Sequence, residues 1–328
     1  MFNYEEFVEY IKENIRKFLE PEFAELSVQI EDVRKNNGVK LKSLLISVPH
    51  KNVAPSIYLE DYYDDYTHGV SLDLILRQIG KVYKEGCTKA DDVSVNIDKV
   101  LKDFDLVKSN IIVEIINTQQ NLQLLQNVPY HIQNGTDLSL IYGVYVCGND
   151  DYVGKILVTN ELMQLWNVTV KDIHDSAIEN TKRILPTQVI DMKEIVGKMF
   201  PPDFIEFVKE QTGELPPIPK ELPMYIITNS KKFKGAGAAF IDEEVLFNLA
   251  KKVQDDLFIL PSSVHECIAV PADERSVSEL MEMVKEVNST QVSTEDYLSD
   301  NVYFYEAQKR TLKMAHAQEF NQQLKHSR

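Results

Sequence analysis

The residue types that acid–base or nucleophilic chemistry needs are concentrated in the stretch LFILPSSVHECIAVP, Leu257–Pro271. Between two apolar runs it holds Ser262, Ser263, His265, Glu266 and Cys267. A nucleophile beside a base and a carboxylate is the minimum set for hydrolysis. However, the glycines of a serine-hydrolase elbow are missing, and Ala269 stands where a zinc-binding HExxH motif needs its second histidine. The stretch therefore matches no known catalytic motif.

The same stretch also has the pattern of a β-hairpin, with Pro261 to Ser263 at its turn. In the second strand, His265 and Glu266 would then point to opposite faces and could not easily serve one site. If one face is buried, its polar residue must find a partner there. His265 and Glu266 are still the candidate catalytic residues of a hydrolase, helped by carboxylates from distant segments and, in one version of this hypothesis, by a metal ion.

A second unusual segment, YLEDYYDDYTHG, interleaves tyrosines with carboxylates and ends near a histidine. Three interpretations stay open: an ordinary packed loop, a partner or ligand surface, and a site for a hard cation. An EF-hand loop is excluded, because the glycine and glutamate spacing does not fit. The candidate binding residues are Tyr58, Asp61, Tyr62, Tyr63, Asp64 and His68.

Two glycine-containing stretches resemble nucleotide-binding loops only superficially. GNDDYVGKI has five residues between its glycines where a P-loop has four, and Ile156 replaces the hydroxyl residue that holds magnesium. KFKGAGAAF lacks the third glycine of a dinucleotide site, although Lys231, Lys232 and Lys234 beside it could attract a small anion. We therefore expect no cofactor.

The elements that must position these residues are mostly hairpins and helices. LSVQIEDVR and VKLKSLLISV are joined by KNNG, an Asn-Gly turn, and LSLIYGVYVC and VGKILVT are a second alternating pair. The apolar run AAFI predicts a short strand, and the aromatic strand VYFY precedes a charged C-terminal helix. Hairpins followed by helices predict an α+β fold with antiparallel or mixed sheets.

Two lobes are expected from the order of these elements. Residues 1–107 form a helix–hairpin–helix lobe, and residues 108–328 a larger α+β domain, with an uncertain boundary between them. The first helix begins at Tyr4, because apolar residues recur at helical spacing from there to Leu19 and Pro21 follows.

Composition limits the classes of function. The chain has 328 residues, is 44% hydrophobic and 26% charged, and has a formal net charge of -16. Such a charge disfavours direct binding to nucleic acid or to an anionic membrane. Three cysteines, widely spaced and odd in number, argue against a disulfide framework. Neither a signal peptide nor an apolar run of about 20 residues is present, so we expect a cytoplasmic protein.

Four stretches carry a resemblance to known families: NVAPSIYLEDYY, YIITNSKKFKGAGAAF, LFILPSSVHECIAVP and VNSTQVSTEDYLSDNVYFY. Together they resemble an uncharacterised family of clostridial gut bacteria, catalogued as a domain of unknown function and covering nearly the whole chain. More distantly, residues from about Asn110 to Asn288 resemble the YtpQ-like family. The resemblance implies a bacterial cytoplasmic protein, often encoded among accessory or mobile genes, and supplies no reaction.

The sequence leads to one main hypothesis of function and two alternatives. Because catalytic motifs are missing, we expect a non-enzymatic binding or regulatory protein with a protein or small-molecule partner. Its contacts would be Tyr58 to His68 or a groove beside Leu257–Pro271. The first alternative is the hydrolase that uses His265 and Glu266. The second is an acidic inhibitor of a nucleic-acid enzyme, which would need one contiguous negative face.

Overall fold

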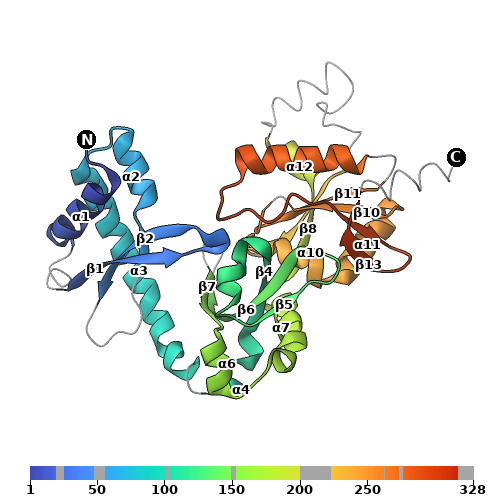
Figure 1. Cartoon of the computed structure of the whole chain (residues 1–328), viewed down its shortest axis with the longest axis horizontal. Coiled ribbons are helices and arrows are strands. Elements are labelled where there is room, and N and C mark those ends of the chain that lie inside the picture. The colour runs from blue at the N-terminus through green and yellow to red at the C-terminus, as the bar shows by residue number, and fades with distance from the viewer. Residues whose placement is uncertain are drawn as a thin grey trace. The chain divides into compact units, whose positions relative to one another are not determined.

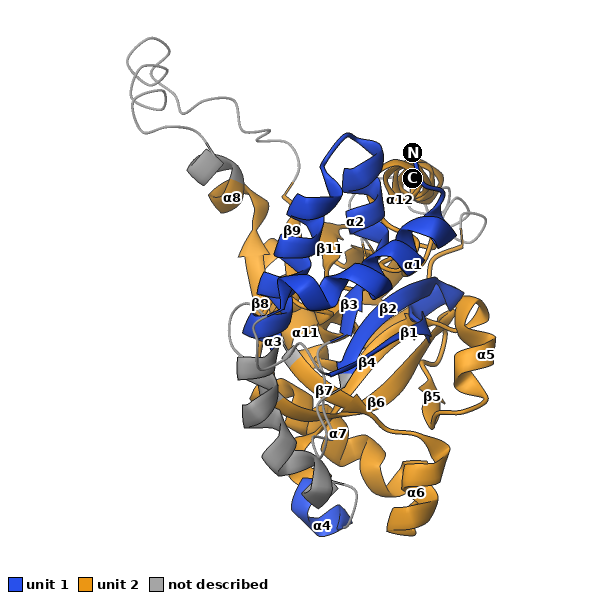
Figure 2. Cartoon of the chain, turned by 90° about the vertical axis from the view of Figure 1, so that its left-hand side faces the viewer, with its two compact units in different colours: residues 1–107 blue, residues 108–328 orange. Residues whose placement is uncertain are grey.

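The structure is a computed structural model that describes residues 1–19, 26–47, 56–100, 103–148, 153–199, 223–261, 263–272 and 276–316. Ser262 lies outside this set. The fold is α+β, and every strand pair in the described residues is antiparallel. The chain divides into two compact units, residues 1–107 and 108–328, which Figure 2 shows in different colours.

Unit 1 combines a three-stranded sheet with helices. Its sheet has the order β1 (Ser27–Arg34), β2 (Lys40–Ser47) and β3 (Ser56–Tyr58). The predicted Asn-Gly turn joins β1 to β2, and both Asn37 and Gly38 have positive φ, as such a turn requires. The helices of this unit are α1 (Tyr4–Asn14), α2 (Glu60–Thr67), α3 (Leu72–Val100) and α4 (Phe104–Val107).

A separate hydrophobic core holds unit 1 together. The first helix begins with a capping box, in which Asn3 accepts from the amide of Glu6 and the Glu6 carboxylate accepts from Asn3. The apolar face of α1 packs against the sheet and against α2 and α3. The core residues include Phe7, Ile11, Ile15, Leu44, Ile46, Leu59, Ile75, Ile79 and Tyr83, all almost fully buried.

Unit 2 contains two sheets. In the four-stranded one, β6 (Leu138–Gly148) pairs on one edge with β4 (Ile111–Asn117) and on the other with β5 (Tyr130–Ile132) and β7 (Val153–Leu157). Helix α7 (Val170–Ile184) packs on β4, and the hydroxyl of Thr181 accepts a hydrogen bond from the Val113 amide. Short α5 (Leu122–Leu125) lies in the chain between β4 and β5, and α6 (Asn160–Trp166) follows β7.

The six-stranded sheet of unit 2 has helices on both faces. Its order is β13 (Thr311–Met314), β12 (Tyr303–Glu306), β10 (Leu257–Leu260), β11 (Cys267–Pro271), β9 (Tyr225–Asn229) and β8 (Thr187–Asp191). Helix α12 (Val277–Gln291) lies across one face in Figure 1 and buries its apolar residues against Phe258, Val270 and Phe304. On the other face are α10 (Ala238–Ile241) and α11 (Glu243–Val253); α8 (Met192–Met199) follows β8.

Several sequence predictions are confirmed and several are wrong. The three hairpins, the first helix and the strand VYFY are present. AAFI, predicted as a strand, is helix α10, and Tyr58 to His68, predicted as a loop, is largely helix α2. The tail after VYFY forms strand β13 instead of beginning a helix, and residues 317–328 lie outside the described set.

Candidate functional site

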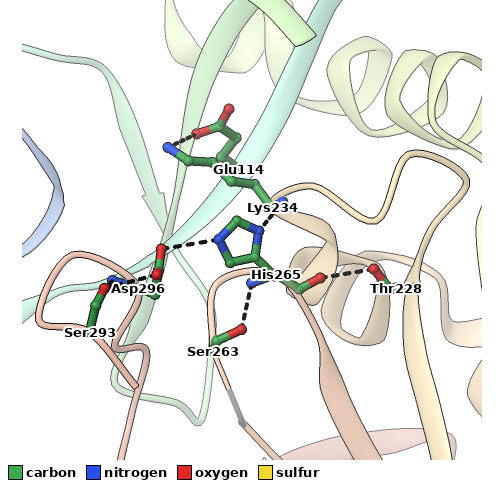
Figure 3. A network of polar contacts seen from close by, with 7 residues as sticks. All are labelled: Glu114, Thr228, Lys234, Ser263, His265, Ser293 and Asp296. Atoms are coloured by element: carbon green, nitrogen blue, oxygen red, sulfur yellow. Dashed lines mark hydrogen bonds and ion pairs between the residues drawn. The ribbon is translucent and has the colours of Figure 1, made fainter. Parts of the chain in front are cut away.

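His265 lies in the loop that joins β10 to β11, not in the second strand, which begins only at Cys267. Its Nε2 is 3.0 Å from Oδ1 of Asp296, and its Nδ1 is 3.2 Å from the backbone nitrogen of Lys234 (Figure 3). Since an amide can only donate, Nδ1 accepts and the ring proton sits on Nε2, which donates to Asp296. Both ring nitrogens are therefore engaged inside the fold.

The backbone around His265 is also fixed by hydrogen bonds. Its carbonyl accepts from the hydroxyl of Thr228 at 2.8 Å and from the amide of Gly235 at 2.9 Å. Its amide donates to the hydroxyl of Ser263 at 3.0 Å. These contacts fix the loop against β9 and the glycine turn, and Figure 3 draws those with Thr228 and Ser263.

Asp296 comes from the segment between α12 and β12. Its Oδ2 accepts from the hydroxyl of Ser293 at 2.8 Å, and its carbonyl accepts from the amide of Val264 at 2.8 Å. Ser293 thus orients the carboxylate that binds His265, and the backbone of Asp296 holds Val264, the residue before the histidine. We call His265 and Asp296 the His–Asp pair.

The glycine turn between β9 and α10 brings its backbone very close to the His265 loop. Lys234 has φ of 47°, and a Cβ on Gly235 would lie 2.6 Å from the Asn229 nitrogen and 2.8 Å from the His265 carbonyl oxygen. The side chain of Asn229 shapes the turn by accepting from the amide of Lys231 and donating to the carbonyl of Phe233. Only glycine fits at position 235.

Beside this turn, Glu114 of β4 is buried between two lysines. Its Oε1 pairs with Nζ of Lys155, from β7, and its Oε2 lies 3.4 Å from Nζ of Lys234. The Glu114 side chain is only 8% exposed. Burial alone would raise the pKa of this carboxyl, but the two ammonium groups lower it to about 2. We call Glu114, Lys155 and Lys234 the charge cluster.

Lys155 reaches Glu114 because Gly143 leaves space between them. Strand β6 separates β7 from β4, and Gly143 pairs with Leu157 on one side and with Ile112 on the other. The Lys155 side chain runs over this glycine, with its Cδ 3.4 Å from the place where a Cβ would be. A larger side chain at 143 would occupy the path of the lysine.

A narrow crevice opens next to the charge cluster. It has a free volume of about 20 Å³, room for roughly one water molecule. The lining comes from β4, α7, the start of β8, the end of β9, the glycine turn and α10. Its polar residues are Glu114, Thr181, Lys182, Thr187, Asn229 and Lys234. Only a small group, or one end of a larger ligand, fits this crevice as it stands.

Of the two candidate catalytic residues, the structure places only His265 in this network. His265 binds Asp296, whereas Glu266 follows it in the loop and its carboxylate acts on the neighbouring Cys267. Burial, and to a smaller extent Glu266, raises the pKa of the Cys267 thiol, so this cysteine is a weak nucleophile. The carboxylate that contacts His265 is therefore that of Asp296, from a distant segment of the chain, and not that of Glu266.

The candidate binding segment, Tyr58 to His68, is divided between core and surface. Tyr63 packs against Tyr4 and Phe7, with ring centroids 5.1 and 5.3 Å apart. Tyr62 is half-buried, and Lys35 lies over the Tyr58 ring. The exposed residues of this segment are Asp61, Asp64, Asp65 and His68, the last being 75% exposed.

Sequence reasoning missed Glu114, Lys155 and Asp296. Glu114 could have been found, since it is the one charged residue in the β-branched run IIVEIIN and a buried charge needs a partner. Lys234 was named as one of three lysines that could attract an anion. Within the described residues no three histidine, cysteine, aspartate or glutamate side chains lie together as metal ligands.

The comparisons with known proteins give a family and no activity. A family model described as a family of unknown function matches residues 4–307. Searches of the curated proteins and of the solved structures return no match. In the described part of the chain, none of the helices has both the length and the apolar character needed to cross a membrane.

Proposed function

This chain belongs to the DUF5688 family, a family of unknown function, and from the geometry of its candidate site we propose that it is a non-enzymatic binding or regulatory protein. Its ligand is a small anion, or the anionic end of a larger molecule, bound at the crevice beside Lys234. The observation that carries this proposal is the engagement of both His265 nitrogens within the fold.

A hydrolytic base must turn one nitrogen to its aspartate and the other to a nucleophile or a water. In this protein the second nitrogen of His265 accepts from the Lys234 amide instead. The Glu114 carboxylate is likewise occupied on both oxygens by lysines. Neither group is free to take a proton from a bound molecule, which favours binding over turnover.

The charge around the crevice favours an anion as the ligand. Two lysines, Lys182 and Lys234, line it, while its one carboxylate, Glu114, is already neutralised by ion pairs. Lys182 forms an ion pair with the exposed Glu179, which an anion in the crevice could replace at little cost. The free volume of about 20 Å³ limits the bound part to a single small group.

Calorimetric titration with sodium acetate and with sodium phosphate tests this proposal, using sodium chloride at equal ionic strength as the blank. We expect saturable binding of at least one anion, weakened by Lys182→Met and abolished by Lys234→Met. Lys251→Met, an exposed lysine of α11, is the matched control and should bind like the wild type. Absence of saturable binding, or equal binding by all three variants, would contradict the proposal.

The hydrolase is the second candidate, and the 3.0 Å distance between His265 and Asp296 is the observation in its favour. It requires the Lys234 amide to release Nδ1 when a substrate binds. Assays of purified protein on ester and phosphoester probes decide the matter: hydrolysis that is lost in both His265→Gln and Asp296→Asn would support it. Hydrolysis that these substitutions leave unchanged would not depend on the His–Asp pair and would count against this candidate.

A further inference from the structure

The uncharged polar side chains that line the crevice beside Lys234 already use their hydrogens within the fold. The hydroxyl of Thr181 donates to a backbone carbonyl of α7 at 2.7 Å, and the hydroxyl of Thr187 donates to Asp242 at 2.8 Å. The side chain of Asn229 donates one of its amide hydrogens to a carbonyl of the glycine turn at 2.8 Å. These three side chains therefore leave at most one N–H for a ligand.

The backbone of the glycine turn is engaged in the same way. The amide of Lys234 donates to the His265 ring, and the amide of Gly235 donates to the His265 carbonyl. What the crevice offers to a ligand is therefore mainly the ammonium groups of Lys182 and Lys234. Their side chains are 32% and 27% exposed, so both are in contact with solvent.

This set of donors suits a carboxylate better than a phosphate. A phosphate group carries more than one negative charge near neutral pH and presents three strong acceptor oxygens, whereas a carboxylate carries one charge on two oxygens. Negative charge near the crevice also disfavours a dianion, because Glu295 and Asp296 act on Lys234 in addition to Glu114. The chemistry of the crevice thus selects a monoanion that needs few hydrogen bonds.

The rest of the crevice lining is apolar and ends in an exposed ring. Ile112, Val113, Leu185 and Ala238 line the crevice and are buried, whereas Phe233 lines it and is 36% exposed. Its ring is fixed by an edge-on contact with a neighbouring imidazole in the glycine-turn network, with ring centroids 5.5 Å apart. An exposed phenyl ring at a crevice lined by two cations is suited to a ligand with an anionic head and an apolar body.

We propose that the ligand of this crevice is a short-chain monocarboxylate, whose carboxylate is bound by Lys182 and Lys234 and whose apolar tail packs on Phe233. The free volume of about 20 Å³ holds only the carboxylate head, so the tail lies on the exposed ring. This inference rests on the proposed function, because it names the chemical class of the anion that the crevice binds.

Calorimetric titration of the full chain at pH 7 with acetate, butyrate and phosphate at equal ionic strength tests the inference. Butyrate should bind about three- to tenfold more tightly than acetate, because its additional methylene groups leave water when they pack on the ring. Phosphate should bind more weakly than butyrate. Titration with 1-butanol, which has the same tail without the charge, should show no saturable binding.

A variant of the ring tests the contact with the tail. Phe233→Ser should lower the affinity for butyrate to about that for acetate. Leu165→Ser, at a 62% exposed apolar residue of α6 outside the crevice, is the matched control and should keep the wild-type preference for butyrate. If Phe233→Ser does not fold, the comparison of the ligands on the wild-type protein decides alone.

The outcomes separate this inference from the proposal on which it rests. Equal affinities for acetate and butyrate, or tighter binding of phosphate than of butyrate, would overturn the monocarboxylate and leave anion binding in place. A preference for butyrate that persists in folded Phe233→Ser would overturn the assignment of the tail to this ring. If neither carboxylate nor phosphate gives saturable binding, the monocarboxylate and the anion site are both wrong.

Discussion

A buried carboxylate between two ammonium groups stabilises the fold through its charge, so an uncharged amide of the same shape cannot replace it. Glu114 has lost almost all its contact with water and is compensated by Lys155 and Lys234. Removing one partner from a buried ion pair leaves the others without compensation, which usually costs more than the pair itself contributes. At the scale of single residues, a substitution in the charge cluster should thus change the free energy of unfolding strongly.

Glu114→Gln should therefore lower the free energy of unfolding by about 3–5 kcal/mol, the usual cost of breaking a buried ion pair. Urea denaturation at pH 7 measures it, with the exposed Glu282→Gln of α12 as control. The folded pKa of Glu114 is about 2, below its ordinary value of 4.5. Its stabilising contribution is therefore present above pH 4.5 and lost as the pH falls towards 2. A difference from wild type that does not shrink in this range would contradict the assignment.

A second group whose pKa the fold shifts is the imidazole of His174. The rings of His131 (β5) and His174 (α7) pack together with centroids 4.0 Å apart and planes tilted by 30°, and the hydroxyl oxygen of Tyr142 (β6) lies 2.8 Å from His174 Nδ1. Burial and the neighbouring His131 lower the pKa of His174, while Asp175 opposes them. The folded state therefore favours the neutral imidazole.

We expect the melting temperature to fall between pH 7.5 and 5.5, and to fall less in His131→Gln. Because the folded pKa of His174 is depressed, its contribution is intact above its ordinary value of 6.5 and is lost as the pH drops through the folded value. Thermal denaturation at several pH values measures this. His68→Gln, at an exposed histidine of unit 1, should follow the wild type. An equally steep fall in His131→Gln would show that the contact between the two histidines is not responsible.

At the scale of elements, the glycine turn between β9 and α10 places Lys234 on both the charge cluster and the His–Asp pair. Its side chain binds Glu114, and its backbone amide binds His265. This double contact needs the close approach that Gly235 permits. The turn thus couples a strand of one sheet to a loop of the other.

Gly235→Ala should destabilise the protein by about 1–3 kcal/mol, because its Cβ would overlap backbone atoms of Asn229 and His265. Gly237→Ala is a matched control two residues away. A Cβ there would meet nothing closer than 3.7 Å, so this variant should be neutral or slightly stabilised. Chemical denaturation of both variants checks the prediction. Equal effects of the two substitutions would mean that the close approach at Gly235 does not matter.

The elements differ in how readily the sequence predicts them. Alternation and an Asn-Gly turn identify β1 and β2 because both signals are local. AAFI was misassigned because four apolar residues have no period, and the high helix propensity of alanine was not weighed. Tyr62, Tyr63 and Tyr66 do have helical spacing, but the carboxylates between them suggested a loop.

The site was less predictable than the fold because its contacts are distant in sequence. His265 was found from its residue type, yet its partner Asp296 lies 31 positions further on and belongs to an ordinary acidic segment. Glu114 and Lys234 are separated by 120 positions. Only the packing of the two sheets in unit 2 brings such residues together, so no local sequence pattern predicts their contacts.

At the scale of the whole molecule, we expect residues 1–107 to fold on their own. Their core is built entirely from within the unit: helices α1 and α3 bury Phe7, Ile11 and Ile79 against Leu44 and Ile46 of the sheet. Unit 2 likewise has its own clusters around α12 and between β4 and α5. A unit that holds its core inside its own boundaries can unfold without exposing the core of the other.

Expressed separately, residues 1–107 and 108–328 should therefore each be soluble and unfold cooperatively, and their circular dichroism spectra should add up to that of the whole chain. A cut after Val158 is the control, because it removes α7 from β4 and leaves the Val113 amide without the Thr181 hydroxyl. The fragment 1–158 should aggregate or lack a cooperative transition, since it exposes the apolar face that α7 covers. If fragment 1–107 is unfolded while the whole chain is stable, the two units depend on each other and are not separate domains.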